Sequence, residues 1–114
     1  MVDDEPDQRF LLRRIFERGG HEVSDAGNGA AALKAVQESA PDLVVTDMMM
    51  AVMGGAELIR CLRADSATAH IPVLAASGDI HLAAGADAAV RKPYEWRHIL
   101  AVADALLKEG RGGS

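Results

Sequence analysis

Cysteine and aromatic residues are scarce in this chain of 114 residues, and their scarcity limits how the fold can be held together. The single cysteine, Cys61, cannot form an internal disulfide, so we expect a reducing compartment, by default the cytoplasm. Aromatic residues make up 4% of the sequence and hydrophobic residues 49%, which predicts a core of small and aliphatic side chains. With 25% charged residues, the composition is that of a globular domain and excludes a disordered tail or a fibre.

Long apolar runs and an excess of basic residues are also lacking. No run approaches the ~20 apolar residues that cross a bilayer, so we expect no membrane association. Asp3, Asp4 and Glu5 stand where a signal peptide would be basic. The net charge of −5 makes direct nucleic-acid binding unexpected. The length fits one domain, which we place over residues 1–109, followed by a flexible tail or linker start over 110–114.

Short apolar runs alternate with amphipathic segments, a pattern typical of βα repeats around a parallel sheet. A compact apolar run over 43–46 indicates a strand buried on both faces. The pattern predicts further strands at 1–2, 21–24, 72–76 and 88–90, and helices over 7–18, 29–39, 56–64 and 94–108.

Polar side chains follow four of the predicted strands at or near their carboxyl ends. They are the pair Asp3 and Asp4, then Asp47, Ser77 and Lys92. Because the carboxyl ends of parallel strands meet at one edge of the sheet, we expect these side chains to converge. Each has an ordinary explanation when taken alone, such as a helix cap for Asp3 or Asp4 and a loop position for the others. The ordered set favours a common site.

The residue types at this edge suit phosphoryl chemistry. Three carboxylates in a small pocket repel one another unless a proton or a cation neutralises them. An all-oxygen site with open positions is typical of Mg²⁺. A lysine supplies positive charge for phosphoryl oxygens, a serine hydroxyl donates a hydrogen bond, and an aspartate nucleophile yields an aspartyl phosphate.

Four stretches of the chain resemble the receiver domain of two-component response regulators. They are VDDEPDQR (2–9), PDLVVTDMMMAVMGG (41–55), IPVLAASG (71–78) and GADAAVRKPY (85–94). With the helices between them, the resemblance covers essentially the whole chain. It implies a CheY-like α/β fold, in which a doubly wound five-stranded parallel sheet has the flavodoxin-like order 2-1-3-4-5.

The resemblance also implies a role for each site residue. Asp47 would accept the phosphoryl group, Lys92 would contact it, and Ser77 would be the hydroxyl switch. Mg²⁺ would be bound by Asp4, by Asp47, by the backbone carbonyl of Met49 and, mainly through water, by Asp3. The Lys92–Pro93 bond would be cis, which only an X-Pro bond forms cheaply.

The chain departs from the family pattern at several positions. Ala51 replaces the usual proline, and Ala89 replaces the aromatic residue that moves on phosphorylation. Gly54 and Gly55 predict a looser loop after the acceptor. Only 14 residues, 78–91, separate the serine from the lysine, so the fourth helix should be truncated or missing. Only two residues precede Asp3, so we expect a short first strand and a native start upstream.

Three functions fit these features. The first is a phosphorylation switch, in which a histidine kinase or phosphotransfer protein donates the phosphoryl group and an unidentified effector acts downstream. In this function the domain is not an enzyme, and it carries out at most self-directed phosphoryl transfer and autodephosphorylation. The second is a degenerate receiver that acts as a phosphorylation-independent interaction module, which Ala51 and Ala89 favour. The third is a phosphohydrolase resembling the haloacid dehalogenase family, but Met49 stands where that chemistry needs an acid/base aspartate. We expect the switch.

Overall fold

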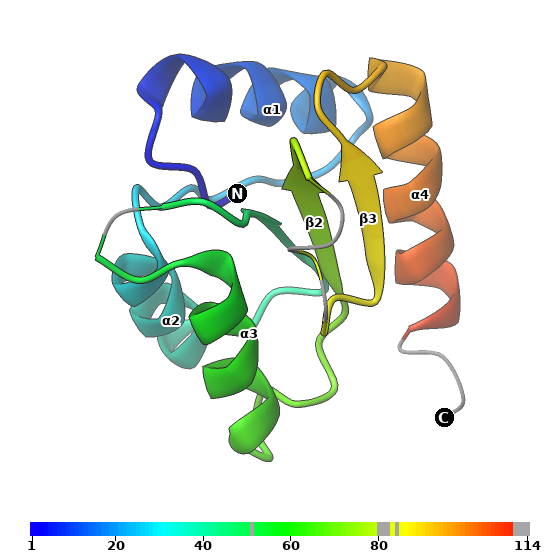
Figure 1. The fold of residues 1–114 in the computed structure, drawn as a ribbon. Helices are drawn as coiled ribbons and strands as arrows, with labels where there is room; N and C mark the ends of the chain where they lie inside the picture. Colours follow the sequence, from blue (N-terminus) through cyan, green and yellow to red (C-terminus); the bar gives the residue numbers. More distant parts are fainter. Residues whose placement is uncertain (51, 80–82, 84, 111–114) are drawn as a thin grey trace.

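Helices and strands alternate along the chain in the computed structural model, which describes residues 1–50, 52–79, 83 and 85–110 (Figure 1). In chain order the elements are α1 (Pro6–Arg18), α2 (Gly29–Glu38), β1 (Val44–Asp47), α3 (Gly55–Ala64), β2 (Val73–Ser77), β3 (Ala88–Arg91) and α4 (Trp96–Glu109). Every predicted helix is present within two residues of its expected ends, because each carries one apolar stripe at helical spacing.

The three strands form one parallel sheet in the order β1-β2-β3. Val44 of β1 pairs with Val73 of β2, and Leu74 of β2 pairs with Ala88 of β3. All residues of β1 and β2 are buried. The apolar run over 43–46 predicted this for β1, because a strand covered on both faces is apolar throughout. The α/β class with a parallel sheet is therefore confirmed.

We expected a five-stranded sheet, but the described residues form a sheet of three strands. At the positions of the first two predicted strands, Val2 forms isolated parallel bridges to Ala26 and to Thr46. No strand forms over 21–24. Because only Met1 and Val2 lie opposite the 21–26 segment, the pairing there stops at a bridge, and the order 2-1-3-4-5 is not established.

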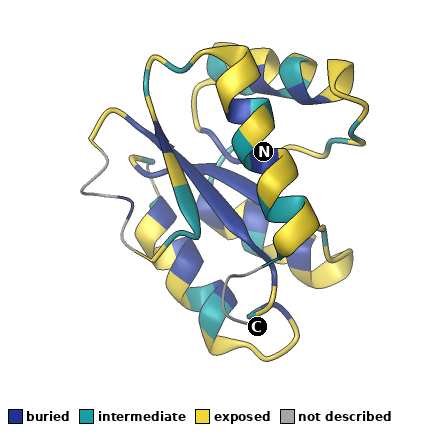
Figure 2. Cartoon of the chain, turned by 90° about the vertical axis from the view of Figure 1, so that its right-hand side faces the viewer, coloured by how far each residue is buried: buried dark blue, intermediate teal, exposed yellow. Residues whose placement is uncertain are grey.

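Helices cover both faces of the sheet, with α1 and α4 on one face and α2 and α3 on the other (Figure 1). Side chains alternate between the two faces along a strand, so Val45 packs with Phe16 and Ile99, while Val44 packs in the opposite cluster. The buried strands appear between exposed helix surfaces in Figure 2. Apart from Phe16 and Met48, the buried hydrophobic side chains are aliphatic, as the low aromatic content predicted.

Arg63 ties the end of α3 to the beginnings of β2 and β3. Its Nη1 donates to the carbonyl of Ile71 at 2.7 Å, and its Nη2 lies 2.6 Å from Asp87 Oδ2. Asp87 Oδ2 also accepts a hydrogen bond from the Val73 amide at 2.8 Å. One carboxylate therefore sets the start of β2 against the residue that precedes β3.

The predicted shortening of the fourth helix falls largely on residues 80–82 and 84, which lie outside the described residues, as does the departure at position 51. The described residues between β2 and β3 form no α-helix. None of the described helices is long and apolar enough to cross a membrane.

Candidate functional site

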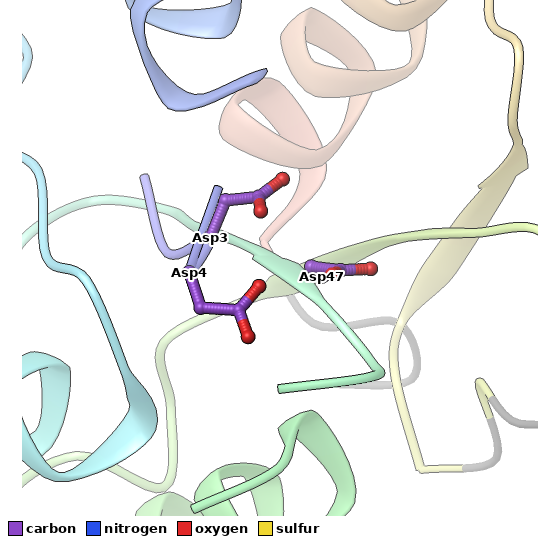
Figure 3. Close-up of side chains that lie close together, drawn as sticks. All are labelled: Asp3, Asp4 and Asp47. Atoms are coloured by element: carbon purple, nitrogen blue, oxygen red, sulfur yellow. The ribbon is translucent and has the colours of Figure 1, made fainter. Parts of the chain in front are cut away.

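Three carboxylates meet at the carboxyl edge of the sheet, where the sequence placed them. Asp3 and Asp4 lie on the segment before α1, and Asp47 is the last residue of β1 (Figure 3). One oxygen from each carboxylate lies within 4.8 Å of the others. Asp3 is 1% exposed and Asp47 9%, whereas Asp4 is exposed. The site is therefore a partly buried acidic pocket that opens to solvent at Asp4.

Asp3 is fixed by contacts on both its backbone and its side chain. Its amide donates to the Ala26 carbonyl at 3.2 Å, and its carbonyl accepts from Arg9 Nη1 at 2.8 Å. Oδ1 accepts a hydrogen bond from the Glu5 amide at 3.0 Å. Asp3 does not cap α1, because the N-cap residue is Glu5 and no side chain makes a capping hydrogen bond. Oδ2 is buried, and no described residue hydrogen-bonds to it. One oxygen of Asp3 is therefore left for another ligand.

Asp47 is fixed by the close approach of α3 to the end of β1. Its Oδ1 accepts from the Met48 amide at 2.9 Å, and the Gly55 amide donates to the Met48 carbonyl at 3.1 Å. A Cβ at Gly55 would lie 2.5 Å from the Asp47 carbonyl oxygen and 2.7 Å from Met48 Sδ. The expectation of a looser loop is wrong at Gly55, because this glycine is needed for close packing.

Lys92 follows β3 and reaches back to two of the carboxylates. Its Nζ lies 3.2 Å from Asp47 Oδ1 and 3.6 Å from Asp3 Oδ2. Its amide donates to the Ser77 carbonyl at 2.8 Å, which continues the sheet pairing beyond β3. The Lys92–Pro93 bond is cis, as predicted.

The remaining predicted residues lie at the same edge. Ser77 is the last residue of β2 and is 1% exposed. Its hydroxyl donates to the Asp79 carbonyl at 2.8 Å and accepts from the Asp79 amide at 3.2 Å. Met49 follows Asp47 by two residues and its side chain is 69% exposed. Metal binding by the Met49 carbonyl stays a prediction.

Tyr94 belongs to this region, and the sequence reasoning gave it no role there. Its hydroxyl oxygen is buried, and no described residue hydrogen-bonds to it. Burial, together with the negative charges of Asp3 and Asp47, raises the pKa of Tyr94 to about 12. Its position two residues after Lys92 was the available signal. Ala89, which stands at the family's aromatic position, is exposed on β3.

The donor set fits Mg²⁺. The three carboxylates carry three negative charges and Lys92 contributes one positive charge, so these four side chains leave a net charge of −2. The buried Asp3 Oδ2 adds an oxygen donor without a hydrogen bond from the described chain. Hard carboxylate oxygens with an open side toward solvent are what Mg²⁺ prefers in proteins. Asp3, Asp4 and Asp47 would hold the ion.

Known proteins are similar to this chain in sequence. The profile of the response regulator receiver domain family matches residues 1–104. The DNA-binding response regulator MtrA of Mycolicibacterium smegmatis is 34% identical over 112 residues, which is 95% of this chain and 49% of that protein. The chain thus spans about half the length of the curated relatives it matches.

Solved structures show the same likeness. The receiver domain of NtrX from Brucella abortus superposes with a TM-score of 0.86 at 30% identity, covering 94% of this chain and 95% of that one. The receiver domain of a histidine kinase from Syntrophus aciditrophicus gives a TM-score of 0.88 at 27% identity, covering 99% and 91%. The family profile, the sequence relatives and the fold agree, and the chain belongs to the response regulator receiver domain family.

Proposed function

We propose that this domain is a phosphorylation switch in which Asp47 accepts a phosphoryl group in a Mg²⁺-dependent reaction. The observation that carries this proposal is the position of the Lys92 ammonium between Asp47 and Asp3. An ammonium there can hold the oxygens of an incoming phosphoryl group beside the acceptor carboxylate. When bound by the three aspartates, Mg²⁺ would neutralise negative charge on the phosphoryl group.

The donor in this proposal is a phosphohistidine of a histidine kinase or phosphotransfer protein. A carboxylate oxygen of Asp47 attacks phosphorus, and a new P–O bond forms. The P–N bond to the imidazole breaks, its electron pair stays on the nitrogen, and that nitrogen takes up a proton. The products are an aspartyl phosphate and a neutral histidine. The chain's own residues contribute position and charge, which are the main components of phosphoryl-transfer catalysis.

The structure suggests how phosphorylation would be read out. The Ser77 hydroxyl is held by the Asp79 backbone through both a donated and an accepted hydrogen bond. To donate to a phosphoryl oxygen on Asp47, this hydroxyl must give up the Asp79 carbonyl. Phosphorylation would then release the backbone at Asp79 and alter the segment after β2.

The proposed reaction is a single phosphoryl transfer with no substrate turnover. Met49 stands two residues after Asp47 and cannot transfer protons, so the chain lacks an acid/base group at that position. We therefore expect at most slow loss of the phosphoryl group to water. This domain is a signalling module in the proposal, and its activity toward other phosphate esters should be absent.

The relatives suggest the kind of output. The Mycolicibacterium smegmatis relative is described as a DNA-binding response regulator and is about twice as long as the matched region. We propose that this receiver likewise controls an effector. Its own net charge of −5 opposes direct contact with DNA phosphates, so any nucleic-acid binding would belong to the effector. The proposed setting is the cytoplasm.

One feature favours a second function, a docking module that works without phosphorylation. In the family, an aromatic residue at one position moves on phosphorylation and couples the acceptor to the surface. Here the position is Ala89, which is small and exposed, so this coupling is missing. In this alternative the acidic pocket is a remnant and the partner binds the same way with or without phosphate.

Intact-mass measurement separates these functions. The wild type is incubated with acetyl phosphate and Mg²⁺, alongside Asp47→Asn and the control Asp42→Asn, which alters an exposed aspartate just before β1. We expect one phosphoryl adduct on the wild type and on Asp42→Asn, none on Asp47→Asn, and none in excess EDTA. Absence of an adduct on the wild type would favour the docking module. Continuous release of phosphate from assorted esters would favour a hydrolase.

A further inference from the structure

The side chain of Arg9, on α1, contacts the main chain of the acidic segment that precedes this helix. Its Nη1 donates to the Asp3 carbonyl at 2.8 Å. This carbonyl belongs to the peptide bond between Asp3 and Asp4, so the contact lies between two of the three carboxylate-bearing residues in the pocket (Figure 3). A side chain of α1 therefore holds the stretch of backbone from which two of the carboxylates leave.

The other polar groups of Asp3 are bound by the main chain. Its amide donates to the Ala26 carbonyl at 3.2 Å, and its Oδ1 accepts from the Glu5 amide at 3.0 Å. Its Oδ2 is buried and receives no hydrogen bond from the described residues. Main-chain contacts survive a change of side chain, so Arg9 is the partner of Asp3 whose contribution a point mutation can measure.

The guanidinium of Arg9 is itself held in place by the segment before α2. Its Nε lies 3.7 Å from Asp25 Oδ2. A Cβ at Gly27 would lie 3.3 Å from Arg9 Nη1, so the guanidinium packs closely against this residue. Because a guanidinium is planar and donates in fixed directions, one side chain can contact a carboxylate and a carbonyl at the same time. The 25–27 segment thus directs Arg9 toward Asp3.

Lysine would keep the charge of Arg9 but could not reproduce its geometry. A lysine carries one ammonium on a flexible stem, without the planar set of donors that spans two partners. Arg9→Lys therefore separates geometry from charge. Arg13 provides a matched control, because its Nη1 lies 3.5 Å from the same oxygen of Asp25 while its Nε pairs with Glu17.

We infer that Arg9 is a positioning residue for cation binding and that it acts through Asp3. By fixing the Asp3 carbonyl, Arg9 fixes the directions in which the Asp3 and Asp4 side chains leave the backbone, so that their oxygens converge with an oxygen of Asp47. Ligands that are already ordered bind more tightly, because less conformational freedom is lost on binding. The inference rests on the proposed function, in which this pocket takes up Mg²⁺.

The affinity of the full chain for Mg²⁺, measured by isothermal titration calorimetry, tests this role. We expect Arg9→Lys to weaken Mg²⁺ binding by about tenfold, as for other groups that orient metal ligands, and Arg13→Lys to leave it unchanged. With acetyl phosphate as donor, Arg9→Lys should raise the Mg²⁺ concentration that gives half-maximal adduct formation much more than it lowers the maximal rate. The reason is that the contacts of Asp47 with Lys92 and with the Met48 amide do not involve Arg9. A role in stability alone would not produce this split.

Gly27→Ala disturbs the same contact without changing any charge. The added Cβ crowds Nη1 of Arg9, so Mg²⁺ binding should weaken in the same direction as in Arg9→Lys. Hydrogen exchange gives a measurement without metal. The Asp3 amide, which donates to Ala26, should exchange about tenfold faster in Arg9→Lys than in the wild type or in Arg13→Lys.

The outcomes separate this inference from the proposed function. Equal Mg²⁺ affinity in the wild type and Arg9→Lys would overturn the inference and leave the proposed function in place. Equal weakening in Arg9→Lys and Arg13→Lys would also overturn it, since the effect would then come from the shared partner Asp25. A wild type that binds no Mg²⁺ would overturn the proposed function and the inference together.

Discussion

The ammonium nitrogen of Lys92 lies 3.2 Å from Oδ1 of Asp47, across 45 positions of sequence. This contact joins the end of β3 to the end of β1 and supplies positive charge against the three carboxylates. We therefore expect Lys92 and a divalent cation to compete to neutralise the same pocket. Such competition would make the stability of the domain depend on Mg²⁺ before any phosphoryl group is present.

Replacing Lys92 by alanine should destabilise the domain and increase its response to Mg²⁺. Without the ammonium, buried Asp3 and nearly buried Asp47 repel each other, which we expect to cost about 1–3 kcal/mol in the free energy of unfolding. Urea unfolding with and without Mg²⁺ measures both effects, with Lys34→Ala on the exposed face of α2 as control. A smaller Mg²⁺ response in Lys92→Ala than in the wild type would contradict the competition.

Gly55 and Gly54 should differ sharply when each is changed to alanine. A Cβ at Gly55 meets the Asp47 carbonyl at 2.5 Å, whereas a Cβ at Gly54 meets its nearest atom, the Met48 carbonyl, at 3.4 Å. We expect Gly55→Ala to cost about 1–3 kcal/mol and to slow phosphorylation of Asp47, because α3 must move away from the acceptor. Gly54→Ala should change both by little. Chemical unfolding and the rate of adduct formation are the measurements.

The Arg63–Asp87 pair should show strong coupling in a double-mutant cycle. The two side chains are mostly buried, their atoms lie 2.6 Å apart, and Asp87 also accepts from the Val73 amide. We expect a coupling energy of about 1–2 kcal/mol from Arg63→Ala, Asp87→Ala and the double variant in urea unfolding. The exposed pair Arg13 and Glu17 on α1 serves as control and should couple much more weakly. Equal coupling in the two cycles would show that the buried pair has no special role in joining the strands.

The hydroxyl of Tyr94 should titrate well above a free phenol. Burial, with the charges of Asp3 and Asp47, raises its pKa to about 12. Tyr94 is the only tyrosine, so its ultraviolet absorbance reports it directly. In the pH range between the unfolded and folded pKa values the unfolded state gives up the proton first, so stability should fall as pH rises above about 10.

Two comparisons check the cause of this shift. The native wild type should titrate near 12, and the urea-unfolded chain near the ordinary value for tyrosine. Asp47→Asn should lower the native pKa, because one of the two nearby negative charges is removed, and Asp42→Asn should leave it in place. A native titration that matches the unfolded chain would show that the hydroxyl is open to water.

The helices and the acidic pocket could be predicted because both depend on local pattern. Apolar residues at helical spacing marked α1 to α4, and the position after an apolar strand marked Asp47 and Ser77. What the sequence did not show depends on distant pairings. Bridges at Val2 in place of two strands follow from how much chain lies opposite the 21–26 segment. A glycine such as Gly55 reads as a flexible position until the neighbouring backbone is known.

The central claim is that Asp47 itself carries the phosphoryl group. After incubation with acetyl phosphate and Mg²⁺, borohydride reduces an aspartyl phosphate to homoserine, and tandem mass spectrometry of the peptides locates it. The proposed function predicts homoserine at position 47 in the wild type, with Asp3 and Asp4 unchanged and no conversion in excess EDTA. Homoserine at either of the other two aspartates, or phosphate retained on a histidine or serine with Asp47 intact, would contradict it.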